Sequence, residues 1–134
     1  MPVVVEAVVT PSAQDEADLA KIYADAPAWL LPPYASASAL IEAGLANGCL
    51  IAGRFNDRLL GAAWLTRHET GWQLSHLCVR RLTRGRGVAA RLVAFARELA
   101  AQQGHTLRLI APTDQLEPQA WAIRLGLKLE APQD

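Results

Sequence analysis

The chain has 134 residues, 51% of them hydrophobic, which is enough for one buried core and too little to favour a second domain. Its 13 basic and 13 acidic residues cancel, which excludes a global field that would attract nucleic acid or an anionic membrane. No apolar run reaches membrane-spanning length, and the opening Val3-Val4-Val5 run has no basic leader, so we expect one cytoplasmic domain over residues 1–134.

The first quarter of the chain predicts a strand and then a helix. Residues 3–9 are short and β-branched, which is typical of a strand. Ser12 can cap a following helix, with Asp15 three residues later completing a capping box, and Pro27 marks the end of that helix. Its apolar stripe consists of Leu19, Ile22, Tyr23 and Ala26.

A proline-rich connection and a second helix come next. Residues 39–46 form a shorter helical segment that closes at Asn47-Gly48. In the connection before it, Trp29 and Tyr34 either line a pocket or cover the edge of the sheet, and we favour the second interpretation.

Three strands are predicted in the middle of the chain. Residues 49–55 and 59–66 are apolar runs joined by Asn56-Asp57-Arg58, which indicates an antiparallel hairpin. A turn at residues 69–71 leads into a further strand over residues 72–79. Strict alternation predicts one face made of Trp72, Leu74, His76 and Cys78 and the other of Gln73, Ser75, Leu77 and Val79.

The stretch Arg84-Gly85-Arg86-Gly87-Val88-Ala89 joins that strand to a long helix. Gly85 and Gly87 allow positive φ angles and leave the backbone open, and the first-turn amides of the helix have no intrahelical acceptor. A strand, glycines and a helix in this order are typical of a phosphate site. The alternative is an ordinary strand-to-helix connection.

The last third of the chain alternates helices and strands. Apolar residues recur at helical spacing over residues 88–103, and Gly104 ends that helix. Residues 106–111 predict a strand, Pro118 begins a helix that Gly126 ends, and residues 127–129 predict a closing strand. The fold class is therefore α/β, with a mixed, mostly antiparallel central sheet flanked by helices.

The two cysteines, Cys49 and Cys78, both lie in apolar strand-like runs. They are too few for a disulfide framework, and no cluster of residues has metal-ligand spacing. We therefore expect two buried thiols and no metal.

The Gly/Arg stretch resembles the Q/R-x-x-G-x-G/A signature of the GCN5-related N-acetyltransferases (GNAT), and the element order is similar to theirs over nearly the whole chain. The resemblance implies that acetyl-CoA or CoA binds here, with the pyrophosphate on the loop amides and the pantetheine arm beside the preceding strand. The implied binding residues are Leu77, Cys78, Val79, Thr83, Arg84, Gly85, Arg86, Gly87, Val88, Ala89 and Ala90.

Within that superfamily, residues 52–60, 77–80 and 83–88 resemble the acetyl-CoA-sensing regulators of aspartate α-decarboxylase. These proteins bind the decarboxylase in an acetyl-CoA-dependent way, promoting maturation of the pro-enzyme and limiting its activity. The resemblance implies that Arg54 and Asn56 contact the partner; the alternative is that both are the solvated end of a hairpin. Residues 26–48 are longer here than in the family pattern, and the carboxyl tail differs.

The residues that would carry acetyl transfer are incomplete. The GNAT pattern often places a proton-donating Tyr four residues before the glycine that ends the last helix, and Ala122 stands there. His76 is the candidate base, although we favour a hydrogen-bonded histidine packed under a helix. Two functions remain: an acetyl-CoA-responsive regulator of the decarboxylase, and an N-acetyltransferase that acts on a primary amine of a small molecule or protein.

Overall fold

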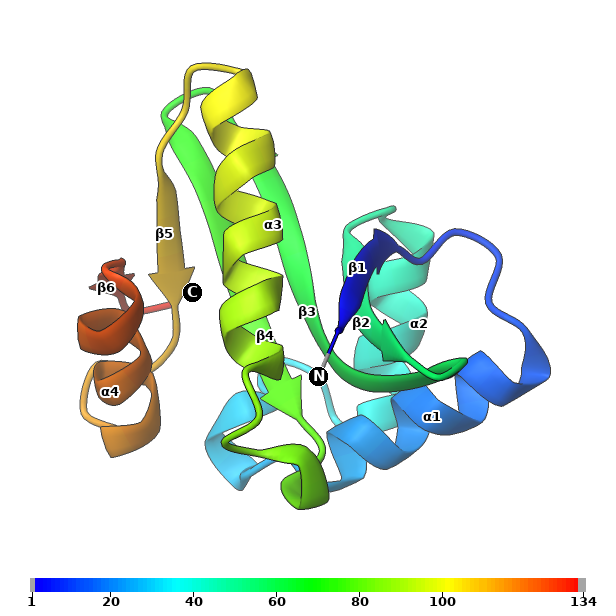
Figure 1. Ribbon diagram of the computed structural model, residues 1–134. Helices are drawn as coiled ribbons and strands as arrows, with labels where there is room; N and C mark the ends of the chain where they lie inside the picture. Colours follow the sequence, from blue (N-terminus) through cyan, green and yellow to red (C-terminus); the bar gives the residue numbers. More distant parts are fainter. Residues whose placement is uncertain (1, 133–134) are drawn as a thin grey trace.

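The computed structural model describes residues 2–132 and confirms the predicted order of elements (Figure 1). The elements are β1 (Val4–Ala7), α1 (Ala13–Ala24), the 3-10 turn η1 (Ala28–Leu30), α2 (Ala37–Ala46), β2 (Leu50–Phe55), β3 (Arg58–His68), β4 (Gly71–Val79), the 3-10 turn η2 (Arg81–Thr83), α3 (Val88–Gln102), β5 (Leu107–Ile110), α4 (Leu116–Leu125) and β6 (Lys128–Glu130).

The six strands form one sheet in the order β1 to β6. The pairs from β1 to β4 are antiparallel, whereas β5 pairs in parallel with both β4 and β6. The predicted fold class, α/β with a mixed and mostly antiparallel sheet, is confirmed. None of the described helices is long and apolar enough to cross a membrane.

Each face of the sheet carries its own buried core. Residues of α3 and α4 pack on one face, around Leu74, Leu92 and Leu109. Residues of α1 and α2 pack on the other face, around Leu19, Leu40 and Leu59. Figure 1 shows α3 lying along β3 and β4, with α1 below these strands and α2 beside β2. Both cysteines are free and buried, as predicted.

Local sequence signals account for the ends of α1 and for the first hairpin. The Ser12 hydroxyl accepts the Asp15 amide at 3.0 Å, and the Asp15 carboxylate accepts the Ser12 amide, so the capping box is confirmed. The helix ends at Ala24. Asn56 and Asp57 have φ of 48° and 65°, the conformation of a two-residue type I′ turn between β2 and β3.

The predicted alternation along β4 is wrong beyond Leu74. Strand β4 places two residues, His76 and Leu77, opposite the single Ala63 of β3, and His76 has φ of 52°. Side chains alternate between the two faces of a strand, so the one extra residue of this β-bulge sends every later side chain to the face opposite the predicted one. Leu77 therefore joins Trp72 and Leu74 in the α3 core, with Val79 beside it, whereas Cys78 lies in the α1 core.

Strands β4 and β5 separate at Ser75, just before the bulge. Their last paired residues are Ser75 and Ile110, so the β5 side of residues 77–79 has no strand partner within the described chain. Beyond this gap, α3 begins close against the sheet. A Cβ on Gly61 of β3 would lie 2.8 Å from Val88 Cγ1, so only glycine lets the start of α3 approach this near.

Candidate functional site

The Gly/Arg loop borders a cavity of about 420 Å³ between the start of α3 and α4, here called the loop cavity. Of the predicted loop residues 83–90, all except Arg86 line it; the exposed Arg86 lies outside. Helix α4 and the end of β4 supply the other walls: Val79, Glu117, Ala120, Trp121, Arg124 and Leu125.

The backbone of the loop is shaped to face this cavity. Gly85 and Gly87 have φ of 80° and 84°, and a Cβ on either would meet nothing within 4 Å, so the space beside them is open. Gly87 is the N-cap of α3, and the first intrahelical bond runs from the Arg91 amide to the Gly87 carbonyl. The amides of Val88, Ala89 and Ala90 thus have no intrahelical acceptor and can receive an anion.

The free edge of β4 continues from this loop. The Arg80 amide donates to the Leu60 carbonyl of β3 at 2.8 Å. Because backbone groups alternate along a strand, the amides and carbonyls of Leu77 and Val79 face away from β3 into the gap. Cys78 points its thiol to the α1 core, where Sγ donates to the Ile22 carbonyl and burial raises its pKa to about 12.

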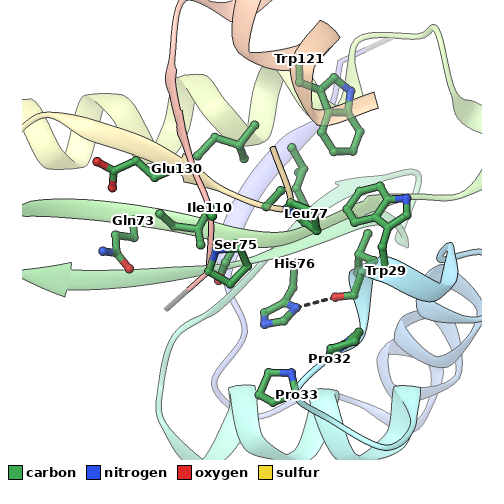
Figure 2. A pocket seen from close by; sticks show the side chains of 16 residues that line it. Trp29, Pro32, Pro33, Gln73, Ser75, His76, Leu77, Ile110, Trp121 and Glu130 are labelled. Carbon is green, nitrogen blue, oxygen red and sulfur yellow. Dashed lines mark hydrogen bonds between the residues drawn. The ribbon is translucent and has the colours of Figure 1, made fainter. Parts of the chain in front are cut away.

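A second cavity of about 240 Å³, here called the gap cavity, lies at the separation of β4 and β5 (Figure 2). Trp121 lines both cavities, so the two adjoin. Trp29 lines the gap cavity, contrary to the interpretation we favoured, whereas Tyr34 packs against the rings of Trp64 and His76. The walls are Trp29, Leu30, Pro32, Pro33, Gln73, Ser75, His76, Leu77, Leu109, Ile110, Ala111, Pro112, Trp121, Glu130, Ala131 and Pro132.

His76 lies in the wall of the gap cavity with a fixed ring. Its Nδ1 is 2.8 Å from the Leu30 carbonyl, which can only accept, so Nδ1 carries the proton and Nε2 is the unprotonated nitrogen in the neutral form (Figure 2). The rings of Trp64 and Tyr34 lie 5.0 and 5.7 Å away. Burial lowers the pKa of His76, so the ring is neutral at pH 7.

Neither tyrosine is placed to replace the missing acid. Ala122 is buried in the α3 core, and no tyrosine or cysteine occurs among the described residues that line the two cavities. The Tyr23 hydroxyl donates to the His76 carbonyl at 2.9 Å, and burial raises its pKa well above the ordinary value. Within residues 2–132, no group of three potential metal ligands comes together.

Two aspartates of helix α1, Asp15 and Asp18, and the aspartate at its C-cap, Asp25, hold arginine-bearing segments. Asp15 accepts two bonds from Arg54, and Asp18 accepts bonds from Arg58 and the Leu59 amide of the β2–β3 hairpin. The sequence analysis did not assign partners to Asp18. Its position in register with Leu19 and Ile22, on an otherwise apolar stripe, is the signal that could have marked it as buried and paired.

The third aspartate, Asp25, holds the loop. Its carboxylate accepts the Arg81 amide at 2.9 Å and Arg80 Nε at 3.4 Å, and its carbonyl accepts from Arg84. Arg84 also donates to the Val79 carbonyl. The chain segment that leads into the glycine loop is thereby attached to the carboxyl end of α1.

The two predicted partner residues differ in exposure. Asn56 is exposed at the hairpin turn, whereas Arg54 is half-buried and ion-paired with Glu6 and Asp15. Arg54 also donates to the Asp57 carbonyl at 3.2 Å, so its guanidinium orients the turn. Phe55 packs against the opposite core, as alternation along the strand requires.

The sequence matches the family model described as Acetyltransferase (GNAT) domain, PanZ, over residues 2–108. It is 40% identical over 82 residues to the PanD regulatory factor of Salmonella typhimurium strain LT2. That alignment covers 61% of this chain and 56% of the relative, so the chain spans little more than half of the length of this relative.

Two solved structures share the fold at low sequence identity. PH1933 from Pyrococcus horikoshii OT3 superposes with a TM-score of 0.77 and 12% identity, covering 99% of this chain and 93% of that one. The PaiA N-acetyltransferase of Thermoplasma acidophilum, in complex with coenzyme A, superposes with a TM-score of 0.68 and 11% identity, covering 92% and 88%. At such identities the likeness shows the fold alone.

The aspartates of α1 and its C-cap predict a stability that depends on pH. Hydrogen bonds from Arg54 lower the pKa of Asp15, and the bond from the Arg81 amide lowers the pKa of Asp25. Burial alone would raise the pKa of Asp18, but hydrogen bonds from Arg58 and Leu59 outweigh this effect and lower it. Because each pKa lies below the ordinary 3.8, their contribution is complete above that pH and is lost as the pH falls through the lower values of the folded state.

We expect Asp18→Asn to lower the free energy of unfolding at pH 7 by about 1–3 kcal/mol, because it weakens bonds to a buried carboxylate. Its deficit relative to the parent chain should shrink below pH 4, measured by urea unfolding across pH. Asp57→Asn at the exposed turn is the matched control and should leave stability nearly unchanged. An Asp18→Asn chain as stable as the control would contradict the structural role of this pair.

Proposed function

The chain belongs to the PanZ family of GNAT acetyltransferase domains, and from this premise we propose that it binds acetyl-CoA or CoA along β4 and regulates PanD, the aspartate α-decarboxylase. The observation that carries the proposal is a continuous row of backbone groups that have no partner in a neighbouring strand or within the helix. It runs from the free edge of Leu77 and Val79 to the first-turn amides of α3. Such a row can bind a ligand that has amide groups along an extended arm and a pyrophosphate at the end of that arm.

The residues of both cavities fit a coenzyme A. The open positions beside Gly85 and Gly87 leave room for phosphate oxygens against the backbone, and Arg84 and Arg124 bring positive charge to the same cavity. The amide and carbonyl of Leu77 and the amide of Val79 would pair with the pantetheine arm as a neighbouring strand does, whereas the Val79 carbonyl already accepts from Arg84. When bound, acetyl-CoA supplies a thioester, and the gap between β4 and β5 receives it.

The absence of a tyrosine or cysteine from the described walls of the two cavities favours regulation over catalysis. Acetyl transfer requires an acid for the leaving thiolate, and the described walls contain neither tyrosine nor cysteine. A ligand that binds without reacting can still shift the affinity of a partner, provided that it binds two states of the protein unequally.

The β2–β3 hairpin is the proposed contact with the decarboxylase. The relative from Salmonella typhimurium is called the PanD regulatory factor, which supports this partner. Asn56 presents an exposed amide at the turn, and Arg54 fixes the turn from beneath. We therefore assign the direct contact to Asn56 and a positioning role to Arg54.

One observation favours the alternative of an active N-acetyltransferase. His76 is neutral, has an unprotonated Nε2 and lies in the wall of the gap cavity. A neutral imidazole beside a thioester can accept the proton of an attacking amine. The regulatory proposal and this alternative use the same coenzyme site.

The coenzyme site predicts that Gly87→Val weakens acetyl-CoA binding at least tenfold in calorimetry, because a branched side chain at φ of 84° is strained and enters the loop cavity. Gly104→Val is the matched control: its φ is 75°, its surroundings are equally open, and it lies at the far end of α3. Both should lose stability, and only the first should lose affinity. If Gly87→Val and Gly104→Val bound acetyl-CoA with equal affinity, the glycine loop would not be part of the coenzyme site.

The hairpin predicts that Asn56→Gly weakens capture of the decarboxylase in the presence of acetyl-CoA, while acetyl-CoA affinity and unfolding midpoint stay unchanged. Glycine keeps the positive φ of the turn and removes only the amide side chain. Asp57→Gly, at φ of 65°, is the control that should bind normally. Surface plasmon resonance with immobilised decarboxylase measures both, and unaltered binding by Asn56→Gly would place the contact elsewhere.

The missing acid predicts that release of free thiol from acetyl-CoA, monitored with a chromogenic disulfide across a panel of primary amines, stays near the uncatalysed rate. His76→Asn is the diagnostic variant, because Asn tolerates the positive φ of this position. Fast turnover in the parent chain that disappears in His76→Asn would establish the acetyltransferase alternative.

A further inference from the structure

We propose that the gap cavity is a binding pocket for acyl chains longer than acetyl, so that the protein prefers unbranched acyl-CoAs from butanoyl to hexanoyl over acetyl-CoA. The inference rests on the proposed coenzyme site and names the acyl group that its far end takes. It follows from the continuity, size and lining of this cavity.

The gap cavity lies where a thioester bound along β4 would end. Val79 lines the loop cavity and Leu77 lines the gap cavity, on the same edge of the strand and about 7 Å apart along it. Trp121 of α4 borders both. A ligand arm that leaves the loop cavity along this edge therefore enters the gap cavity with its acyl end.

The cavity is much larger than an acetyl group requires. Its volume is about 240 Å³, whereas one water molecule occupies about 30 Å³ of liquid. An acetyl group adds only a carbonyl and a methyl to the sulfur, so most of the space would stay unfilled. Additional methylenes could occupy it without displacing the walls.

One part of the wall consists of apolar side chains. Trp29, Leu30 and Pro32 approach from the α1–α2 connection, and Leu77 and Ile110 approach from the sheet (Figure 2). His76 adds a neutral ring whose N–H is already bonded to Leu30. Each methylene buried against such a wall tightens binding by up to about fourfold.

The far end of the cavity is polar and sets a limit on the ligand. Gln73 and Glu130 line it, and the Glu130 carboxylate is bonded to Arg108 at 2.9 Å. None of the described lining residues is a lysine or an arginine. A carboxylate at the end of an acyl chain would be buried without a cation, so succinyl-CoA should be rejected although its carbon chain is as long as that of butanoyl-CoA.

Calorimetry of the full chain with CoA, acetyl-CoA, butanoyl-CoA, hexanoyl-CoA and succinyl-CoA tests the proposal. We expect butanoyl-CoA to bind about tenfold more tightly than acetyl-CoA, and succinyl-CoA to bind at least tenfold more weakly than butanoyl-CoA. Equal or weaker binding of butanoyl-CoA, with normal acetyl-CoA binding, overturns the acyl pocket and leaves the coenzyme site standing. Failure of every ligand to bind overturns both.

Variants that fill the cavity test its location. Ala111→Leu should abolish the preference for butanoyl-CoA and leave the affinity for CoA within about twofold, because it adds bulk to the buried wall. Ala101→Leu, on the exposed side of α3, is the matched control and should keep the preference. Ser75→Leu, at a less buried position of the same wall, serves if Ala111→Leu does not fold. A preference that survives in the filled cavity overturns the assignment.

Discussion

The β-bulge at His76 is the constraint on which both cavities depend. One extra residue in β4 exchanges the faces of the strand, which sends Leu77 and Val79 to the α3 side and Cys78 to the α1 side. Pairing between β4 and β5 stops at Ser75, one residue before His76, and the gap between these two strands opens there. The strained backbone of His76 is held from both ends, since its ring donates to Leu30 and its carbonyl accepts from Tyr23.

Helix α1 connects the two surfaces that the proposed function uses. Asp15 and Asp18 hold the β2–β3 hairpin, and Asp25 holds the chain that enters the glycine loop. The glycine loop and the hairpin are therefore both held by the same helix, although they lie far apart in sequence. A shift of α1 relative to the sheet would move the partners of all three aspartates, which are the contacts that a ligand-dependent regulator would need to change.

The features that could be predicted correctly from the sequence are local ones. The Ser12 capping box, the Asn56-Asp57 turn and the glycine loop each depend on a few neighbouring residues, and the structure has all three. The bulge was not predictable, because the pattern of apolar residues in β4 fits plain alternation and His76 is not a residue that marks positive φ as glycine does. The partners of Asp18 and Asp25 are far away in sequence, at Arg58 and Arg81, so only folding identifies them.

The attachments of Arg84 have a thermodynamic consequence for any anion that enters the loop. Before a ligand arrives, the guanidinium of Arg84 already donates to the carbonyls of Val79 and Asp25, and it lies 3.8 Å from Glu117. Immobilising a free arginine would oppose binding by about 0.5–1.5 kcal/mol. Much of that entropy is lost during folding in this protein, so the loop is preorganised and the free energy of its phosphate contacts goes more fully into affinity.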